Sequence, residues 1–207
     1  PRLRDAAGHP VFPTFGTAAF TERALVHESQ VVAIPEEIPF PQASVLGCAT
    51  ITGAGAAINA AGVRPGDSVA VIGIGGIGLN ILSGAALAGA ATIVAVDLSA
   101  EKLELAKRFG ATHTVNGGNG DPIGAVREIL GDGVDHAFEA IGLPITTTQA
   151  LRMTRIGGQV LLIGLQPPGS SMEVAVMDDI ITPQRTVKGV FMGSANIKRD
   201  IPVYADL

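Results

Sequence analysis

The chain has 207 residues, enough for one complete domain and part of another. Its net charge of −5 gives no reason to expect a nucleic acid or an anionic membrane as a partner. A single cysteine excludes a disulfide within the chain, so a reducing, cytoplasmic location is expected.

The first predicted elements lie in the N-terminal third of the chain. Alternating apolar residues predict two short strands, at Ala19–Val26 and Gln30–Ile34. Residues 44–62 are rich in alanine and glycine and predict a helix. We expect this helix to kink near Gly53 and Gly55, because glycine weakens a helix interior.

The next segment is the most informative one. A buried strand at Val69–Ile72 leads into the turn Gly73-Ile74-Gly75-Gly76-Ile77-Gly78. A helix follows, and then a second strand at Thr92–Val96, which Asp97 ends. This order predicts a dinucleotide site. The absence of charge from Ser68 to Val96 indicates strands buried on both faces, rather than a membrane span.

The glycines of this turn have different physical roles. Gly73 lets the chain turn tightly, Gly75 lets a pyrophosphate approach the backbone, and Gly78 lets the helix pack on the strand. Gly76 belongs to the same predicted coenzyme-binding set. The free N–H groups and the dipole of the helix start favour a diphosphate. The alternatives are a turn that serves packing alone and a site for S-adenosylmethionine.

Asp97 favours NAD over NADP as the bound dinucleotide. It follows Gly78 at close to the roughly 20-residue spacing expected for the carboxylate that accepts the ribose hydroxyls. A 2′-phosphate would meet this carboxylate as a like charge, which costs about 4 kcal/mol at 4 Å and an effective dielectric constant of about 20. Lys102 stands in the first turn of the next helix and could reach the same ribose.

Strands and helices alternate over the rest of the chain, which predicts an α/β fold. Helices are expected at Ala100–Phe109, Pro122–Leu130 and Leu143–Arg155, and strands at Thr112–Val115, Val134–Ala140, Gln159–Ile163 and Thr186–Phe191. A long connection, residues 164–185, includes a β-like segment at Met172–Val176. The pattern predicts a Rossmann fold, a doubly wound parallel sheet of six strands in the order 3-2-1-4-5-6.

A wider set of motifs resembles the zinc-dependent medium-chain alcohol dehydrogenases. The run Gly47-Cys48-Ala49-Thr50-Ile51-Thr52-Gly53-Ala54-Gly55 and the turn Val63-Arg64-Pro65-Gly66-Asp67 precede the glycine turn in the order typical of that family. Later matching segments are Phe138-Glu139-Ala140-Ile141-Gly142, the run from Gly158 to Gly164, and Lys188-Gly189.

The resemblance implies a function and a set of site residues. Cys48 would be a ligand of the catalytic zinc, which polarises the alcohol oxygen so that hydride can leave for the nicotinamide. Thr52 and Ile77 would lie near the nicotinamide. The implied backbone lining of the rest of the coenzyme groove is Ile141, Gly142, Gly164 and Leu165. The expected reaction is the reversible oxidation of an alcohol to an aldehyde or ketone.

The chain also departs from the family pattern. The family's other zinc ligands and its proton-relay hydroxyl would lie upstream of Pro1, and Gly8-His9-Pro10 lacks the Glu of the ligand motif. We therefore expect residues 1–42, which end in a proline-rich boundary, to be the remnant of a β-rich, GroES-like catalytic domain. Residues 43–207 would be the NAD-binding domain with a linking helix. The chain alone would then be inactive.

Two other functions remain open: a zinc-free quinone or enoyl reductase of the same superfamily, and a dinucleotide-binding module without chemistry. The resemblance also implies a homodimer or homotetramer joined by edge strands, here near Met172–Val176 or Thr186–Val190. Among other polar residues, His113 and His136 are expected to be structural. Glu139 would either face the coenzyme crevice or be a hydrogen-bonded carboxylate at a strand end.

Overall fold

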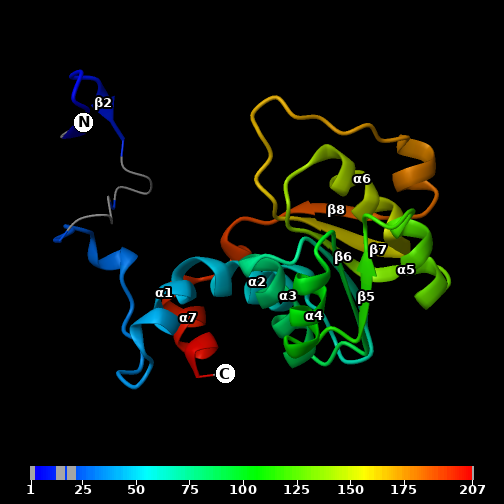
Figure 1. Ribbon diagram of the computed structural model, residues 1–207, viewed down its shortest axis with the longest axis horizontal. Coiled ribbons are helices and arrows are strands. Elements are labelled where there is room, and N and C mark those ends of the chain that lie inside the picture. Colours follow the sequence, from blue (N-terminus) through cyan, green and yellow to red (C-terminus); the bar gives the residue numbers. More distant parts are fainter. Residues whose placement is uncertain (1–2, 13–16, 18–21, 207) are drawn as a thin grey trace.

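A parallel sheet of six strands forms the centre of the computed structural model, which describes residues 3–12, 17 and 22–206 (Figure 1). The strands are β3 (Ser68–Ile72), β4 (Thr92–Asp97), β5 (His113–Asn116), β6 (Val134–Glu139), β7 (Thr154–Leu162) and β8 (Thr186–Gly189). They lie in the order β5-β4-β3-β6-β7-β8, and all neighbours are parallel. This is the predicted order 3-2-1-4-5-6, so the doubly wound α/β fold is confirmed.

Helices cover both faces of the sheet because successive side chains of each strand point to opposite faces. Val69 and Val71 of β3 belong to one apolar cluster, which includes residues of α3 (Gly76–Leu87) and α4 (Ala100–Arg108). Ala70 and Ile72 belong to a second cluster, with residues of α5 (Pro122–Leu130) and α6 (Pro144–Met153). The sheet is therefore buried on both faces, as its uncharged sequence predicts.

One continuous helical run precedes β3. It consists of α1 (Phe40–Val45), η3 (Leu46–Thr50), α2 (Ile51–Gly55) and η4 (Ala56–Ala61), and it ends at Gly62 in the left-handed conformation. Gly53 and Gly55 lie in a short stretch of regular α-helix, and wider π-helical turns flank it on both sides. These glycines serve close packing. An added Cβ would lie 2.5 Å from Ile77 O at Gly53 and 2.8 Å from Gly193 O at Gly55.

By length and composition alone, this run of 22 residues is also the one helix among the described residues that could cross a membrane. Its second half does not have the surroundings of a membrane span. Every residue of α2 is buried, and α2 packs against α3. A core helix of a folded domain has the same composition. The uncharged stretch from Ser68 to Val96 forms β3, α3 and most of β4, as predicted.

The N-terminal segment differs from the prediction and lies apart from the sheet (Figure 1). Of the predicted strand Ala19–Val26, the first residues fall outside the described part of the chain, and residues 22–26 form no strand. The predicted strand Gln30–Ile34 is also wrong, since residues 28–30 form a 3₁₀ turn, η2. Extended backbone becomes a strand only beside a second strand. Here the carbonyls of Glu28 and Val31 accept hydrogen bonds from the Lys198 ammonium instead.

Two further segments differ from the prediction. A short hairpin pairs β1 (Leu3–Arg4) with β2 (Pro10–Val11), in a segment whose sequence predicts no element. In contrast, the β-like segment Met172–Val176 forms no strand, and η5 (Val176–Ile181) is a helical turn. Alternation of apolar residues is thus insufficient where no neighbouring strand is available.

The predicted helix Leu143–Arg155 is too long at its C-terminal end. The α-helix ends at Met153, and β7 begins at Thr154, which pairs with Val134. The register then shifts, because the next pair joins Gln159 to His136. The intervening residues bulge out of the strand, which the positive φ of Gly157 allows.

After β8, the chain returns to the helical run. The turn η6 (Met192–Ser194) packs on α2, and α7 (Ile197–Ala205) lies beside η3 and α2 (Figure 1). The buried carboxylate of Asp200 accepts hydrogen bonds from Asn59 and from the backbone N–H of Asn196. These contacts fix α7 against the run that carries Cys48.

Candidate functional site

A groove of about 680 Å³ lies at the carboxyl ends of β3, β4 and β6. This is where the strand order reverses around β3, the usual position of a ligand site in a doubly wound sheet. Five predicted residues line it: Gly73, Gly75, Asp97, Lys102 and Ile141. Side chains from the next connections complete it, among them Leu98, Ser99, Leu143, Ile145, Thr146 and Gln149. Much of the predicted site is therefore gathered in one cavity.

The glycine turn forms the floor of this groove. Gly73 has φ +97°, in the region that favours glycine, and an added Cβ would lie 2.5 Å from Ile141 Cγ1. At Gly78 an added Cβ would lie 2.0 Å from Gly73 O, so the start of α3 touches the end of β3. At Gly75 an added Cβ would meet nothing within 4 Å. Gly73 and Gly78 are thus required by the fold, whereas the space above Gly75 is left for a ligand.

The N-terminus of α3 begins next to this open space. Gly75 is the N-cap and contributes no capping side chain. The N–H groups of the first turn, at Gly76, Ile77 and Gly78, have no acceptor within their own helix. Together with the helix dipole, they favour an anionic group. The free N–H groups at the start of α3 and the open space above Gly75 therefore lie together.

Asp97 forms one wall of the groove next to the glycine turn, and its side chain is only 10% exposed. Its Oδ2 accepts a hydrogen bond of 2.8 Å from the Ile74 N–H, and its Oδ1 accepts one of 2.9 Å from the Ser99 N–H. The Lys102 ammonium lies 3.8 Å from Oδ2. The carboxylate thus holds the glycine turn in place and keeps acceptor capacity for one more donor.

The connection after β6 forms the other wall, and Glu139 organises it. This side chain is fully buried, and its Oε1 accepts hydrogen bonds from the backbone N–H groups of Ile141 and Gly142 and from the Thr146 hydroxyl, at 2.8 to 2.9 Å. Its Oε2 is buried without a hydrogen-bond partner among the described residues. The structure therefore favours the second expectation for Glu139, a hydrogen-bonded carboxylate at a strand end.

The connections after β6 and β7 touch through two glycines. An added Cβ at Gly164 would lie 2.1 Å from Gly142 N, and one at Gly142 would lie 2.5 Å from Leu165 O. The close approach leaves apolar side chains at the surface here. Leu165 is 82% exposed and Ile141 is 44% exposed. Exposed apolar side chains beside a groove are typical of a ligand site.

The remaining predicted residues lie on the helical run and not in the groove lining. Cys48 is an exposed free thiol in η3. Thr52 is buried in α2, with its hydroxyl 3.9 Å from Met192 Sδ. Among the residues that the structure describes, no three His, Cys, Asp or Glu side chains are placed to hold a metal ion. Cys48 is thus one donor, and these residues do not fit a zinc site by themselves.

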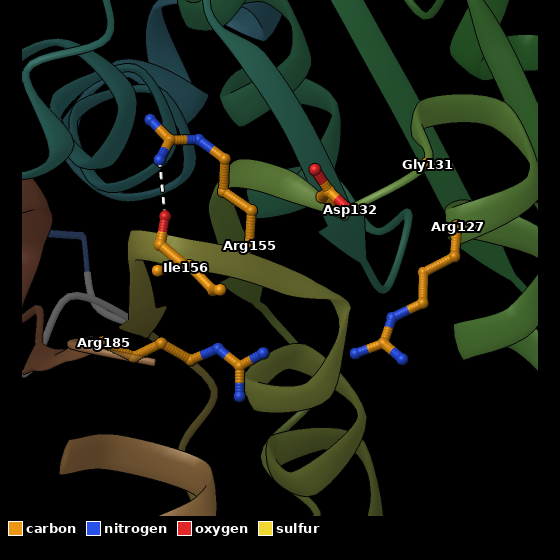
Figure 2. Close-up of a pocket in the computed structure, with 6 residues that line it drawn as sticks. All are labelled: Arg127, Gly131, Asp132, Arg155, Ile156 and Arg185. Carbon is orange, nitrogen blue, oxygen red and sulfur yellow. Dashed lines mark hydrogen bonds between the residues drawn. The ribbon is translucent and has the colours of Figure 1, made fainter. Parts of the chain in front are cut away.

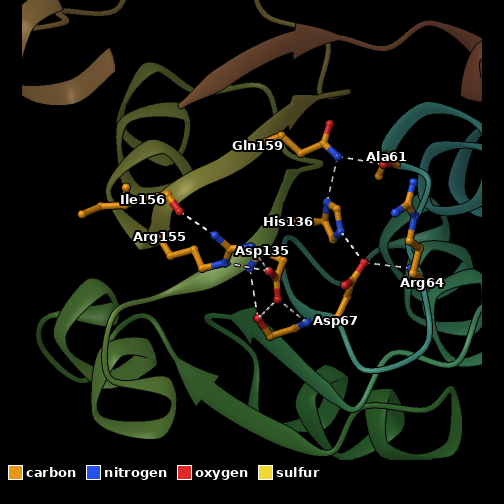
Figure 3. Close-up of polar contacts among 9 residues, drawn as sticks. Ala61, Arg64, Asp67, Asp135, His136, Arg155, Ile156 and Gln159 are labelled. Atoms are coloured by element: carbon orange, nitrogen blue, oxygen red, sulfur yellow. Dashed lines mark hydrogen bonds and ion pairs between the residues drawn. The ribbon is translucent and has the colours of Figure 1, made fainter. Parts of the chain in front are cut away.

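The histidines have the structural roles expected of them. His136 Nε2 lies 2.8 Å from Asp67 Oδ2, and the amide of Gln159 bridges His136 Nδ1 and the Ala61 carbonyl (Figure 3). If the Gln159 amide nitrogen donates to Nδ1, His136 carries its proton on Nε2 and donates it to Asp67. This network joins the start of the sheet to η4. His113 is exposed and pairs with its neighbour Thr112.

The carboxylate of Asp135, in the same region, links the strands β3, β6 and β7. Asp135 accepts hydrogen bonds from the Ser68 backbone and hydroxyl and from Arg155 (Figure 3). Burial raises the pKa of Asp135, but the hydrogen bonds from Ser68 and Arg155 outweigh it, so the pKa lies below its usual value. These contacts lie at the amino ends of the strands, away from the groove.

Several groove residues were not predicted from the sequence. Three of them follow β6, and in the sequence they look like ordinary residues at or near the start of a helix: Leu143, Ile145 and Gln149. Leu98 and Ser99 follow Asp97 in the same way. The available signal is position, because residues just after the central parallel strands face the same edge of the sheet. Ile145, 65% exposed at the start of a helix, is the clearest example.

The comparisons with known proteins agree with this geometry. The model of the family described as zinc-binding dehydrogenase matches residues 76–207. The geraniol dehydrogenase of Castellaniella defragrans is 35% identical over 207 residues, which cover 99% of this chain and 55% of that protein. The chain thus spans about half the length of the curated relatives it matches.

Two solved structures show the same arrangement. The benzyl alcohol dehydrogenase of Acinetobacter calcoaceticus has a TM-score of 0.90 and 35% identity, covering 98% of this chain and 57% of that chain. A zinc-binding dehydrogenase of Sinorhizobium meliloti, solved bound to NADP, has a TM-score of 0.72 and 31% identity, covering 82% of this chain and 50% of that chain.

Proposed function

Because the chain belongs to the zinc-binding dehydrogenase family, we propose that it is the coenzyme-binding part of an oxidoreductase that transfers hydride between an alcohol and NAD. The observation that carries this proposal is the open backbone cradle at Gly75, with Asp97 beside it in the same groove. The names of the relatives support alcohols and aldehydes as the substrate class. Residues 43–207 would form this part, and residues 1–42 would belong to a GroES-like catalytic domain.

The groove residues would bind and orient the dinucleotide in separate ways. The N–H groups of the first turn of α3 would hold the diphosphate, and Asp97 with Lys102 would hold the adenosine ribose. Gly142, Gly164, Leu165 and Ile141 would shape the nicotinamide end, with Thr52 and Ile77 near it. A bound nicotinamide supplies hydride transfer. The protein's contribution is position and exclusion of water.

We expect NADH to bind at least tenfold more tightly than NADPH. The Asp97 carboxylate is nearly buried, and a 2′-phosphate placed beside it would meet a like charge. Half of the roughly 4 kcal/mol of repulsion at an effective dielectric constant of about 20 exceeds a tenfold change in affinity. Titration followed by nicotinamide fluorescence measures both dissociation constants.

Asp97→Asn should narrow the gap in affinity between the two coenzymes, because the amide removes the charge while its one oxygen still accepts from one of the two backbone N–H groups. Asp121→Asn is the matched control, since Asp121 caps α5 outside the groove. Equal affinities of the unchanged chain for NADH and NADPH would contradict the role of Asp97. Tighter binding of NADPH would instead favour the alternative function, a zinc-free quinone or enoyl reductase of the same superfamily.

We also propose Cys48 as one zinc ligand in a protein of the family's full length. Its thiol is exposed at the helical run beside the glycine turn, where Ala49 Cβ would lie 3.6 Å from a Cβ added at Gly76. Metal analysis of such a protein should find zinc that Cys48→Ser depletes. Ser44→Ala, one turn earlier on the same helix, should leave the zinc content unchanged. Undiminished zinc in the Cys48 variant would remove this residue from the site.

The edge of the sheet supports a proposal for assembly. β8 is the terminal strand, and all four of its residues are exposed. An exposed edge strand offers unpaired N–H and C=O groups to a second chain. We infer that β8, rather than the segment Met172–Val176, would join two copies into a homodimer or a homotetramer. We also propose a cytoplasmic location, with neither a membrane nor a nucleic acid as a partner.

A further inference from the structure

A second cavity, of about 510 Å³, lies at the amino ends of β6, β7 and β8, the edge of the sheet opposite the groove. Arginines from three elements line it: Arg127 of α5, Arg155 of β7 and Arg185 just before β8. Gly131, Asp132 and Ile156 complete the lining. Figure 2 shows Arg127 and Arg185 extending toward one another from opposite walls. The role proposed for the groove does not use any of these residues.

Backbone carbonyls hold the two facing arginines in place. Arg127 Nη2 donates to the Arg152 carbonyl at 2.9 Å. Arg185 Nε donates to the Thr154 carbonyl at 2.8 Å, and its Nη1 donates to the Asp179 carbonyl at 3.3 Å. A guanidinium has five N–H donors, so each side chain keeps several for a ligand. Their positions are therefore set before any ligand arrives.

These two guanidinium groups also differ from Arg152 and Arg155, their neighbours, because they form no ion pair with a described residue. Asp135 pairs with Arg155 at 2.5 Å, and Asp179 lies 3.8 Å from Arg152. Within the part of the chain that the structure describes, no carboxylate is within 4 Å of the charged nitrogens of Arg127 or Arg185. Asp132 lines the cavity as well, and the charge of Asp179, which lies 3.8 Å from Arg152, also acts on Arg185.

The proximity of the two arginines carries a cost in the structure as it stands. Burial lowers the pKa of the Arg185 guanidinium, and the charge of Arg127 lowers it further. An anion between the two groups would replace this repulsion by two attractive, charge-assisted contacts. Arginine is suited to this role, because its planar group binds phosphate and carboxylate oxygens in pairs.

We propose that this cavity binds a small dianionic oxyanion, a phosphate group or a dicarboxylate, between Arg127 and Arg185. The site is separate from the groove and lies at the other edge of the sheet. Its ligand would bridge α5 and the strand β8, which are brought together only by the fold.

A nuclear magnetic resonance titration of the 207-residue chain tests this proposal. Sodium phosphate, and in a second series sodium succinate, is added at constant ionic strength while the arginine Nε–H and backbone N–H signals are followed. We expect saturable shifts at Arg127, Arg185 and Gly131. Arg127→Gln should weaken the binding roughly tenfold, since it removes a charge-assisted hydrogen bond. Arg108→Gln, exposed on α4 and equal in charge change, should leave it unchanged.

Arg127 is the residue to substitute first because it is exposed, whereas Arg185 also supports the backbone at Thr154. Saturable binding of either anion at these arginines, weakened in the Arg127 variant alone, supports the site, and the stronger of the two identifies its chemistry. The proposal is overturned if neither anion binds, or if Arg127→Gln and Arg108→Gln weaken binding equally. It is also overturned if the shifts occur only at Gly75 and Gly76, which would show phosphate at the α3 N-terminus.

Discussion

Gly75→Val is expected to reduce NADH affinity at least a hundredfold, about 3 kcal/mol, while the chain stays folded. The reason is geometric. A Cβ at this position meets no protein atom within 4 Å, and the backbone φ of −97° is one that valine adopts readily. The isopropyl group would therefore enter the space in which the diphosphate must approach the N–H groups of α3. Fluorescence titration gives the affinity, and circular dichroism gives the folded state.

Two other glycine variants make this experiment specific. Gly189→Val is the matched control, because Gly189 also has open space around an added Cβ but lies on β8, away from the groove. It should bind NADH normally. Gly78→Ala is the converse, since its Cβ would lie 2.0 Å from Gly73 O and should destabilise the fold itself. If Gly75→Val binds NADH with unchanged affinity, the open space above Gly75 is not the diphosphate site.

Glu139→Ala is expected to lower the free energy of unfolding by about 3 kcal/mol or more, and to weaken NADH binding as well. One carboxylate oxygen accepts three hydrogen bonds from the turn that forms a wall of the groove. Its removal leaves the backbone N–H groups of Ile141 and Gly142 without this acceptor and opens a cavity at a fully buried position. Urea unfolding measures the stability, and the NADH titration measures the effect on the wall.

Two further glutamate variants separate the possible causes. Glu104→Ala removes a surface carboxylate whose side chain is 73% exposed and which pairs with Lys107, so its effect should stay within about 0.5 kcal/mol. Glu139→Gln keeps an oxygen for the three donors but places an amide N–H₂ where Oε2 now has no partner among the described residues. We expect Glu139→Gln to lose less stability than Glu139→Ala and more than Glu104→Ala. If Glu139→Ala is as stable as the unchanged chain, Glu139 does not organise this wall of the groove.

Much of the fold follows from local patterns in the sequence. The strands Val69–Ile72 and Thr92–Val96 are continuous apolar runs because both faces of a parallel sheet are covered, and the turn between β3 and α3 is recognisable because its glycines serve close packing at fixed offsets. Where a segment depends on a partner strand, the same reasoning fails. Residues 22–26, 30–34 and 172–176 have the composition of strands, yet they form no strand in the described part of the chain.

The candidate site, like the fold, can be predicted only in part from the sequence. The motif predicts Gly73, Gly75 and Asp97, because a tight turn and an acid after the second strand have local signatures. The sequence does not predict that Asp97 holds the Ile74 N–H, or that Glu139 supports the facing wall. It also gives no sign that Arg127 and Arg185, 58 positions apart in numbering, face each other across a cavity.

The sequence by itself thus determined the α/β class, the strand order and the glycine cradle, because hydrophobic periodicity and backbone conformation depend on near neighbours in the chain. Only the tertiary structure decided which connections form the walls of the groove, that Gly53 and Gly55 serve close packing, and which charges lack a partner. These properties depend on distances between residues far apart in the chain, which are set only when the helices pack on the sheet.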